Sequence, residues 1–144
     1  MTVTWILVAN RAQARLFESA GRGKELQLVR EIEHPEGRLA THELGSDRPG
    51  RTHDSLGQGR HAMGKEHDAA EQTAIRFAKQ LSVLLEEGRT QNRFTKLVLI
   101  AEPRFLGHLR SALSRETAAT VVASLDKDLP GIDAKELSHH LAGI

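Results

Sequence analysis

The stretch VTWILVANRAQARLFE, residues 3–18, decides the fold. Its first half, Val3 to Ala9, is continuously apolar and rich in Val, Ile and Trp, which is typical of a central strand covered on both faces. Asn10 and Arg11 then make a tight connection to the segment from Ala12 to Glu18, in which Ala14 and Leu16 alternate with Arg15 and Phe17. The sequence therefore predicts two strands joined by a short turn.

The rest of the chain continues with one strand and then alternates helices and strands. A long helix is predicted from apolar side chains at helical spacing, with Asp68 and Glu71 in a capping-box pattern at its start. Three strands joined by short turns, followed by helical crossovers, predict an antiparallel start with parallel additions. The predicted elements after residue 18 are a strand at 25–33 with Leu26, Leu28 and Ile32 at even spacing, a helix from Asp68 to Gly88, a strand at 96–101, a helix from Pro103, a short helical stretch after Ser114, a strand at 120–125, and a last helix capped by Asp133 and Glu136.

These elements predict an α/β fold with one mixed five-stranded sheet of order 3-2-1-4-5. Helices are expected on both faces of the sheet, so the fold is a single three-layer domain over residues 1–144. Its length and its 39% hydrophobic content suit one core.

Composition narrows the class of protein further. The chain has no cysteine, which excludes a disulfide framework, a thiolate metal site and a cysteine nucleophile, and favours a cytoplasmic location. The apolar N-terminal run lacks the basic region and cleavage site of an export signal, and no apolar stretch approaches the roughly 20 residues that cross a bilayer. We therefore expect no membrane partner. The net charge of +1 creates no global field for nucleic acid, so any such attraction must be local.

A long basic loop is predicted from His34 to His67, because these roughly thirty residues show no clear periodicity, and loops of that length are usually functional or disordered. The loop holds five of the eight histidines. Its glycines permit close backbone approach to a phosphate-rich partner. The alternative interpretation is a solvated loop without a function. Between residues 48 and 65 the fixed positive charges are Arg48, Arg51, Arg60 and Lys65, against Asp54 alone.

Nucleotide and hydrolase motifs fit this loop poorly. Gly59 to Lys65 has the spacing of a P-loop before a helix, but Glu66 replaces the Ser or Thr that holds Mg²⁺, and no strand precedes Gly59. No GxSxG elbow and no GxGxxG turn is present, so a serine hydrolase and a dinucleotide enzyme are excluded.

Metal chemistry is also poorly supported. The loop histidines and their neighbouring carboxylates match no compact zinc template. A two-metal nuclease on this sheet order would need an acidic side chain on the first strand, where only Asn10 stands at the end. We expect no metal and no cofactor. The zinc ligands considered are His53, His61 and His67 with Asp54 or Asp68, and the nuclease carboxylates considered are Asp126 and Asp128.

Six segments resemble the bacterial host attachment protein family, over nearly the whole chain. They are WILVANRAQARLFE, HPEGR, SDRPGR, GQGRHAMGKEHD, FTKLVLIAEPRFLGHLR and VVASLDKDL. That family is in turn similar to the middle domain of archaeal and eukaryotic class-1 peptide release factors, which implies the same sheet order in a ribonuclease-H-like topology. In those factors a Gly-Gly-Gln loop between a strand and a long helix enters the peptidyl transferase centre and helps water attack the peptidyl-tRNA ester.

The resemblance implies a site at the tip of the basic loop. Gly57 and Gln58 match the second glycine and the glutamine of that motif, and Leu56 stands in place of the first glycine. Gly59 would then supply, just after the glutamine, the backbone freedom that the first glycine gives in the motif. A glutamine has no useful acid or base strength, so its role would be to orient water, while a backbone N–H stabilises developing charge. The implied catalytic residues are Gln58, Gly57 and Gly59, and the implied RNA-binding residues are Arg48, Arg51, Arg60 and Lys65.

The resulting hypothesis is a cytoplasmic factor that binds ribosomes or tRNA, through RNA phosphates, and hydrolyses the peptidyl-tRNA ester during ribosome rescue or simply occupies the ribosome. Few aromatic side chains are available for stacking on bases, and no DNA partner is expected. Stop-codon reading is not expected, because the chain lacks the codon-reading domain of a full release factor. The alternative is a non-enzymatic regulatory protein that affects attachment to host cells. The sequence makes no prediction of oligomeric state.

Overall fold

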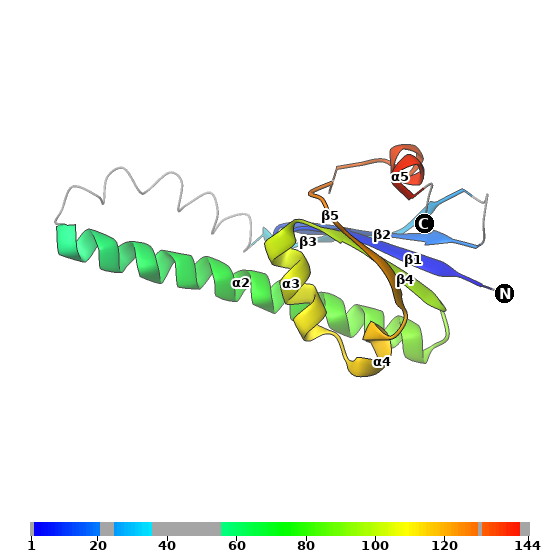
Figure 1. The fold of residues 1–144 in the computed structure, drawn as a ribbon, viewed down its shortest axis with the longest axis horizontal. Helices are drawn as coiled ribbons and strands as arrows, with labels where there is room; N and C mark the ends of the chain where they lie inside the picture. Colours follow the sequence, from blue (N-terminus) through cyan, green and yellow to red (C-terminus); the bar gives the residue numbers. More distant parts are fainter. Residues whose placement is uncertain (1, 21–24, 36–55, 130, 142–144) are drawn as a thin grey trace.

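Five strands form one mixed sheet whose order, β3-β2-β1-β4-β5, is the order that the sequence predicts. The computed structural model describes residues 2–20, 25–35, 56–129 and 131–141, with side chains from residue 69 onward in the third range. Figure 1 shows α2, α3 and α4 on one face of the sheet and α5 on the other, which confirms the predicted three-layer α/β fold. The strands are β1 (Thr4–Ala9), β2 (Gln13–Ser19), β3 (Gln27–Glu33), β4 (Lys96–Ala101) and β5 (Val121–Asp126). The helices labelled in Figure 1 are α2 (Leu56–Thr90), α3 (Pro103–Ala112), α4 (Arg115–Ala118) and α5 (Ala134–Leu141).

β1 lies at the centre of the sheet, antiparallel to β2 and parallel to β4. Its tight connection to β2 is built by Asn10, whose side-chain oxygen accepts hydrogen bonds from the backbone N–H groups of Ala12 at 2.8 Å and Gln13 at 2.9 Å. An asparagine that bonds the backbone two and three residues ahead closes a turn without a glycine. This explains why the chain reverses within the predicted connection.

The continuous apolar run of β1 serves two cores, one on each face of the sheet. Trp5 and Leu7 pack with α2 and α3, whereas Ile6 and Val8 pack on the face that α5 covers. Side chains of a strand alternate between the two faces, so a strand buried on both must be apolar at every position. β4 repeats this arrangement beside β1, and together they form the most deeply buried part of the fold.

β3 departs from the even spacing that the sequence predicts. Ile32 packs on the α2 side of the sheet, whereas Leu26 packs on the α5 side. The reason is a β-bulge, because Leu28 and Arg30 pair with adjacent residues of β2 and leave Val29 outside the ladder. One extra residue reverses the face on which each following side chain lies. β3 is otherwise the exposed strand that the sequence predicts.

The long helix begins at Leu56 and not at Asp68, so the predicted capping-box pattern lies inside α2 and the predicted loop from His34 to His67 is shorter at its C-terminal end. Residues 36–55 lie outside the described part of the chain. Figure 1 shows that the N-terminal part of α2 projects beyond the sheet. A helix acquires apolar spacing where it packs on a core. The projecting segment, residues 56–69, therefore carries no helical periodicity from which its structure could be predicted.

Candidate functional site

Most of the predicted site residues lie on the projecting segment of α2, on a helix and not in a loop. Positions 58 and 65 are seven residues apart, so they lie on the same side of this helix. The first turn of α2 contains no acidic residue, and the backbone N–H groups of a first helical turn have no intrahelical acceptors. The residues on this segment are Gly57, Gln58, Gly59, Arg60 and Lys65, whereas Arg48 and Arg51 lie outside the described residues.

A group of charged side chains lies where α2 leaves the sheet, and we name it the basal cluster: Arg11, Glu71, Glu102, Arg104 and His108. The parallel pairing of β1 with β4 brings the turn after β1 next to the start of α3, because Ala9 and Ala101 are partners at the ends of these strands. The turn supplies Arg11, α2 supplies Glu71, and α3 supplies Arg104 and His108 together with Glu102, the residue just before its first turn.

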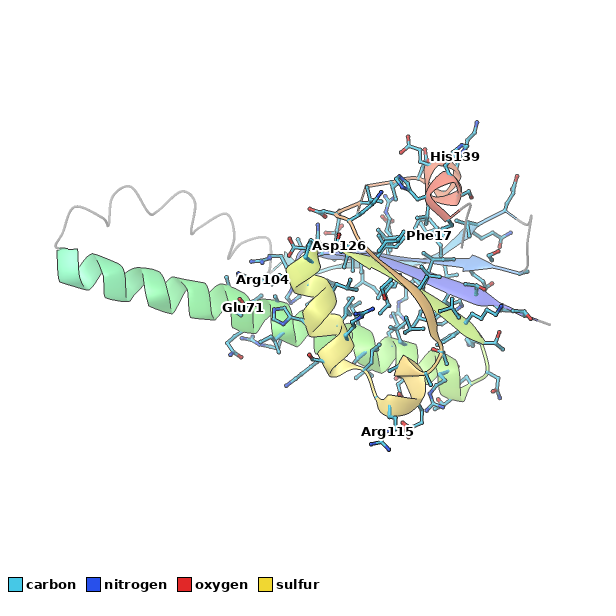
Figure 2. All side chains as sticks on the ribbon, in the orientation of Figure 1. Phe17, Glu71, Arg104, Arg115, Asp126 and His139 are labelled. Atoms are coloured by element: carbon cyan, nitrogen blue, oxygen red, sulfur yellow. The ribbon has the colours of Figure 1, made fainter. Side chains whose placement is uncertain are left out.

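Glu71 is the centre of the basal cluster. Its Oε1 contacts Nε2 of His108, and its Oε2 lies 3.6 Å from the Arg104 guanidinium. The hydrogen bond with His108 lowers the pKa of the Glu71 carboxyl, partial burial opposes this, and the charges of Arg104 and Arg11 lower it further. Figure 2 shows Glu71 and Arg104 at the point where α2 departs from the sheet. Glu71 therefore links α2 to α3 as a carboxylate.

The remaining pair of the basal cluster lies at the edge of the sheet. An Arg11 guanidinium nitrogen is 3.6 Å from Oε1 of Glu102. That oxygen is buried and accepts no hydrogen bond within the described part of the structure. A charged oxygen without a hydrogen bond needs a nearby opposite charge, which Arg11 provides.

His34 is a buried core residue, although the sequence places it at the start of the predicted loop. Its backbone N–H donates to the Ala12 carbonyl at 2.8 Å, and its Nδ1 lies 3.0 Å from the Arg11 carbonyl oxygen. Its ring stacks on Phe77 of α2, with centroids 4.4 Å apart and an interplanar angle of 1°. Phe77 in turn contacts Phe105 of α3 at a centroid distance of 5.8 Å. Phe77 is thus held between the end of β3 and α3.

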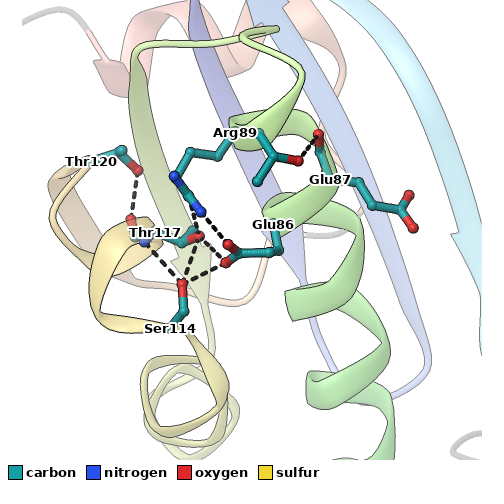
Figure 3. Close-up of polar contacts among 7 residues, drawn as sticks. Glu86, Glu87, Arg89, Ser114, Thr117 and Thr120 are labelled. Carbon is teal, nitrogen blue, oxygen red and sulfur yellow. Dashed lines mark hydrogen bonds and ion pairs between the residues drawn. The ribbon is translucent and has the colours of Figure 1, made fainter.

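A second polar network fixes the opposite end of α2 (Figure 3). The Glu86 carboxylate accepts hydrogen bonds from the hydroxyls of Ser114 at 2.5 Å and Thr117 at 2.6 Å, and it also pairs with Arg89. These three partners lower the pKa of Glu86 to about 2. Ser114 also caps α4, since its oxygen accepts from the Thr117 N–H at 3.1 Å. The network joins α2 to the start of α4.

Metal ligation has no candidate in the part of the chain whose side chains are described, where no three His, Cys, Asp or Glu side chains lie together as ligands. His53, and the side chains of His61, His67 and Asp68, lie outside that part. Asn10 and Asp128 are joined by a long hydrogen bond of 3.4 Å at the carboxyl edge of the sheet. Among the described helices, none combines the length and apolarity that a membrane crossing requires.

Sequence reasoning missed the basal cluster. The sequence pattern places Glu71 in a capping box and does not single out Arg104 or His108. The contact between Glu71 and His108 joins residues that are 37 apart in the chain, so it becomes visible only once α3 is known to lie beside α2. One signal was present: Arg104 and His108 are four residues apart on a predicted helix, and so share a face.

The sheet order and the helix layers define a class of α/β fold that also occurs in an archaeal translation termination factor. A crystal structure of an archaeal translation termination factor, aRF1, matches with a TM-score of 0.52 and 12% identity, over 99% of this chain and 35% of that chain. A second match, described as an archaeal protein, has a TM-score of 0.53 and 11% identity, over 98% of this chain and 34% of that chain. At these identities the likeness is one of fold, and the chain spans about a third of either protein.

Within this class the chain belongs to the family described as proteins required for attachment to host cells, whose sequence pattern matches residues 5–141. The predicted resemblance to that family is therefore confirmed. No curated protein matches the sequence.

Proposed function

We propose that this chain is a cytoplasmic factor that binds ribosomes or tRNA and presents Gly57, Gln58 and Gly59 to RNA at the end of α2. The observation that carries this proposal is the projection of α2 beyond the sheet, with these residues in its first turn. The fold shared with a translation termination factor also supports a role at the ribosome. In this proposal the whole chain acts as one domain.

The projecting segment has the physical properties that a phosphate-rich partner requires. Unsatisfied N–H groups and the positive end of the helix dipole favour anions at the start of a helix. Arg60 and Lys65 add two positive charges on the same segment, and Arg48 and Arg51 precede it in the sequence. Gln58 would orient a water molecule against the peptidyl-tRNA ester, while the ribosome supplies the rest of the reaction site.

Binding is tested by co-sedimentation of the purified chain with bacterial ribosomes at two salt concentrations. If the four basic residues each neutralise one phosphate, affinity should fall about 50- to 150-fold as salt rises from about 50 to about 200 mM. Lys65→Ala should weaken binding. It should also reduce the slope of log affinity against log salt by the amount that corresponds to about one phosphate contact. Lys79→Ala, an exposed lysine on the packed part of α2, is the matched control and should leave binding unchanged.

Hydrolysis is tested by release of a labelled peptide from peptidyl-tRNA on the ribosome. Gln58→Ala should lower the release rate and leave ribosome binding intact, whereas Gln80→Ala, an exposed glutamine on the same helix, should change neither. Release that is unaffected by Gln58→Ala would refute the assignment of the motif.

A chain that neither co-sediments with ribosomes nor releases peptide would refute the ribosomal function altogether. The function would then be the non-enzymatic alternative, a regulatory protein that affects attachment to host cells, which the family description favours.

A further inference from the structure

The projecting segment of α2 is a long helical arm, which we call the lever, and its base is where α2 meets the sheet. Ala70 is the first buried side chain among the described residues of this helix, and Ala69 before it is exposed. Gln58 precedes Glu71 by thirteen residues, which corresponds to about 20 Å along a helix that rises 1.5 Å per residue. Any tilt of α2 at its base is therefore amplified at Gln58.

The apolar packing at the base of the lever is shallow. Ala70, Thr73 and Ala74 are the buried residues of the described part of α2 that precede Phe77, and side chains this small cannot interdigitate with their neighbours as a larger one does. Phe77 is the first large anchor, held between His34 and Phe105. Further along α2, buried Leu81 and Leu85 and the Glu86 network hold the helix, so the described part that precedes Phe77 is the part without a large buried side chain.

Glu71 attaches this weakly packed part of α2 to α3. It lies six residues before Phe77, about 9 Å nearer the projecting segment. Its contacts with His108 and Arg104 of α3 oppose a sideways swing of α2 away from α3, which the small side chains of Ala70, Thr73 and Ala74 resist less well. On the side of the sheet, the charge of Arg11 also acts on Glu71, and Arg11 itself pairs with Glu102.

We propose that Glu71, with His108 and Arg104, is a positioning residue that sets the angle at which α2 projects. The geometry is demanding, because a tilt of about 3° moves Gln58 by about 1 Å over a lever of about 20 Å. A misplacement of about 1 Å can lower a catalytic rate by about 10²-fold. The consequence for peptide release rests on the proposed function, but the angle itself does not.

The angle is measured by the distance between two spin labels, which this cysteine-free chain accepts at chosen positions without background. One label replaces Ala62 on the projecting segment, and the other replaces Lys135, an exposed residue of α5. The parent should give a single narrow distance distribution. Glu71→Ala should broaden it or move its mean by about 2 Å, the displacement that a tilt of about 10° gives at Ala62, about 13.5 Å from Glu71 along the helix.

Two further variants separate positioning from general loss of structure. Glu71→Gln keeps an acceptor for the imidazole N–H without the charge, and should give an intermediate width. Glu87→Ala removes an exposed glutamate of the same helix, which points away from the network of Glu86 in Figure 3, and should reproduce the parent distribution. If Glu71→Ala does not fold by circular dichroism, His108→Gln takes its place. A folded variant of either kind with an unchanged narrow distribution overturns the proposal.

The functional consequence has its own readout. In a chain that releases peptide, Glu71→Ala should lower the release rate at saturating ribosomes by tenfold or more, on the order of the effect of misplacement, and leave ribosome affinity unchanged. Affinity that falls with the rate would overturn the positioning role. If the parent does not bind ribosomes, the proposed function fails, and the distance distributions alone still decide whether Glu71 sets the angle.

Discussion

Replacing Gly88 with alanine should destabilise the protein, although alanine is the better helix former. In a helix interior the exchange is usually favourable by about 1 kcal/mol. At Gly88, however, the added methyl carbon would lie 2.4 and 2.6 Å from two ring carbons of Trp5 and 3.1 Å from Phe94. Carbon atoms prefer separations of about 3.5–4.0 Å, so the indole would have to move by about 1 Å.

Trp5 has little room for such a movement. It is 4% exposed, its ring lies 4.8 Å from that of Phe94, and its Nε1–H donates to Glu18 at 3.0 Å. Overpacking of this kind costs about 1–3 kcal/mol, and loss of a hydrogen bond to a charged acceptor costs about 1.5–3 kcal/mol. If both costs apply, and after about 1 kcal/mol of helix propensity is subtracted, Gly88→Ala should lower the free energy of unfolding by about 1.5–5 kcal/mol. This corresponds to a fall in melting temperature of about 5–17 °C.

The assay is urea unfolding followed by the fluorescence of Trp5, the single tryptophan of the chain. Gly107→Ala on α3 is the matched control, because a methyl group there would meet nothing within 4 Å. It should raise the unfolding free energy by up to about 1 kcal/mol. A Gly88→Ala protein as stable as the parent, with unchanged emission, would refute the packing argument.

Two further predictions concern polar contacts at helix ends. Ionised Glu86 stabilises the fold above its ordinary pKa of 4.5, because the folded-state value is about 2, and this contribution is lost as pH falls from 4.5 toward 2. As pH falls from 4.5 toward 2, the melting temperature should therefore decrease less for Glu86→Gln than for the parent. An equal decrease in both proteins would contradict the prediction. Asp133 accepts a hydrogen bond from the Glu136 N–H at 2.8 Å at the start of α5. Asp133→Ala should cost about 1 kcal/mol in urea unfolding, and no change would show that this cap is unimportant.

Sequence patterns predicted the sheet because its strands owe their pattern to burial. β1 and β4 are apolar at successive positions since both faces are covered, and this is visible without coordinates. The start of α2 could not be predicted in the same way. Residues 56–69 project beyond the sheet, so no core selects apolar side chains there, and the pattern begins only at Ala70.

Only the linear part of the candidate site could be proposed from the sequence. The glycine, glutamine and basic residues around Gln58 are adjacent in sequence, so a motif singles them out, and their role stays a prediction. The basal cluster depends on α3 lying beside α2, and the buried position of His34 depends on a stacking partner on another element. Contacts of this kind follow from the tertiary arrangement, and local spacing carries no signal for them.

The bulge at Val29 has a consequence for the solubility of the protein. β3 is an edge strand of the sheet, and its adjacent side chains Leu28 and Val29 are 48% and 46% exposed. An exposed apolar edge is a template on which the strand of another molecule can add. Because the bulge twists the strand and interrupts its regular pairing pattern, an incoming strand finds no continuous row of backbone partners. The irregularity that reverses the faces of β3 therefore also discourages the sheet from growing across molecules.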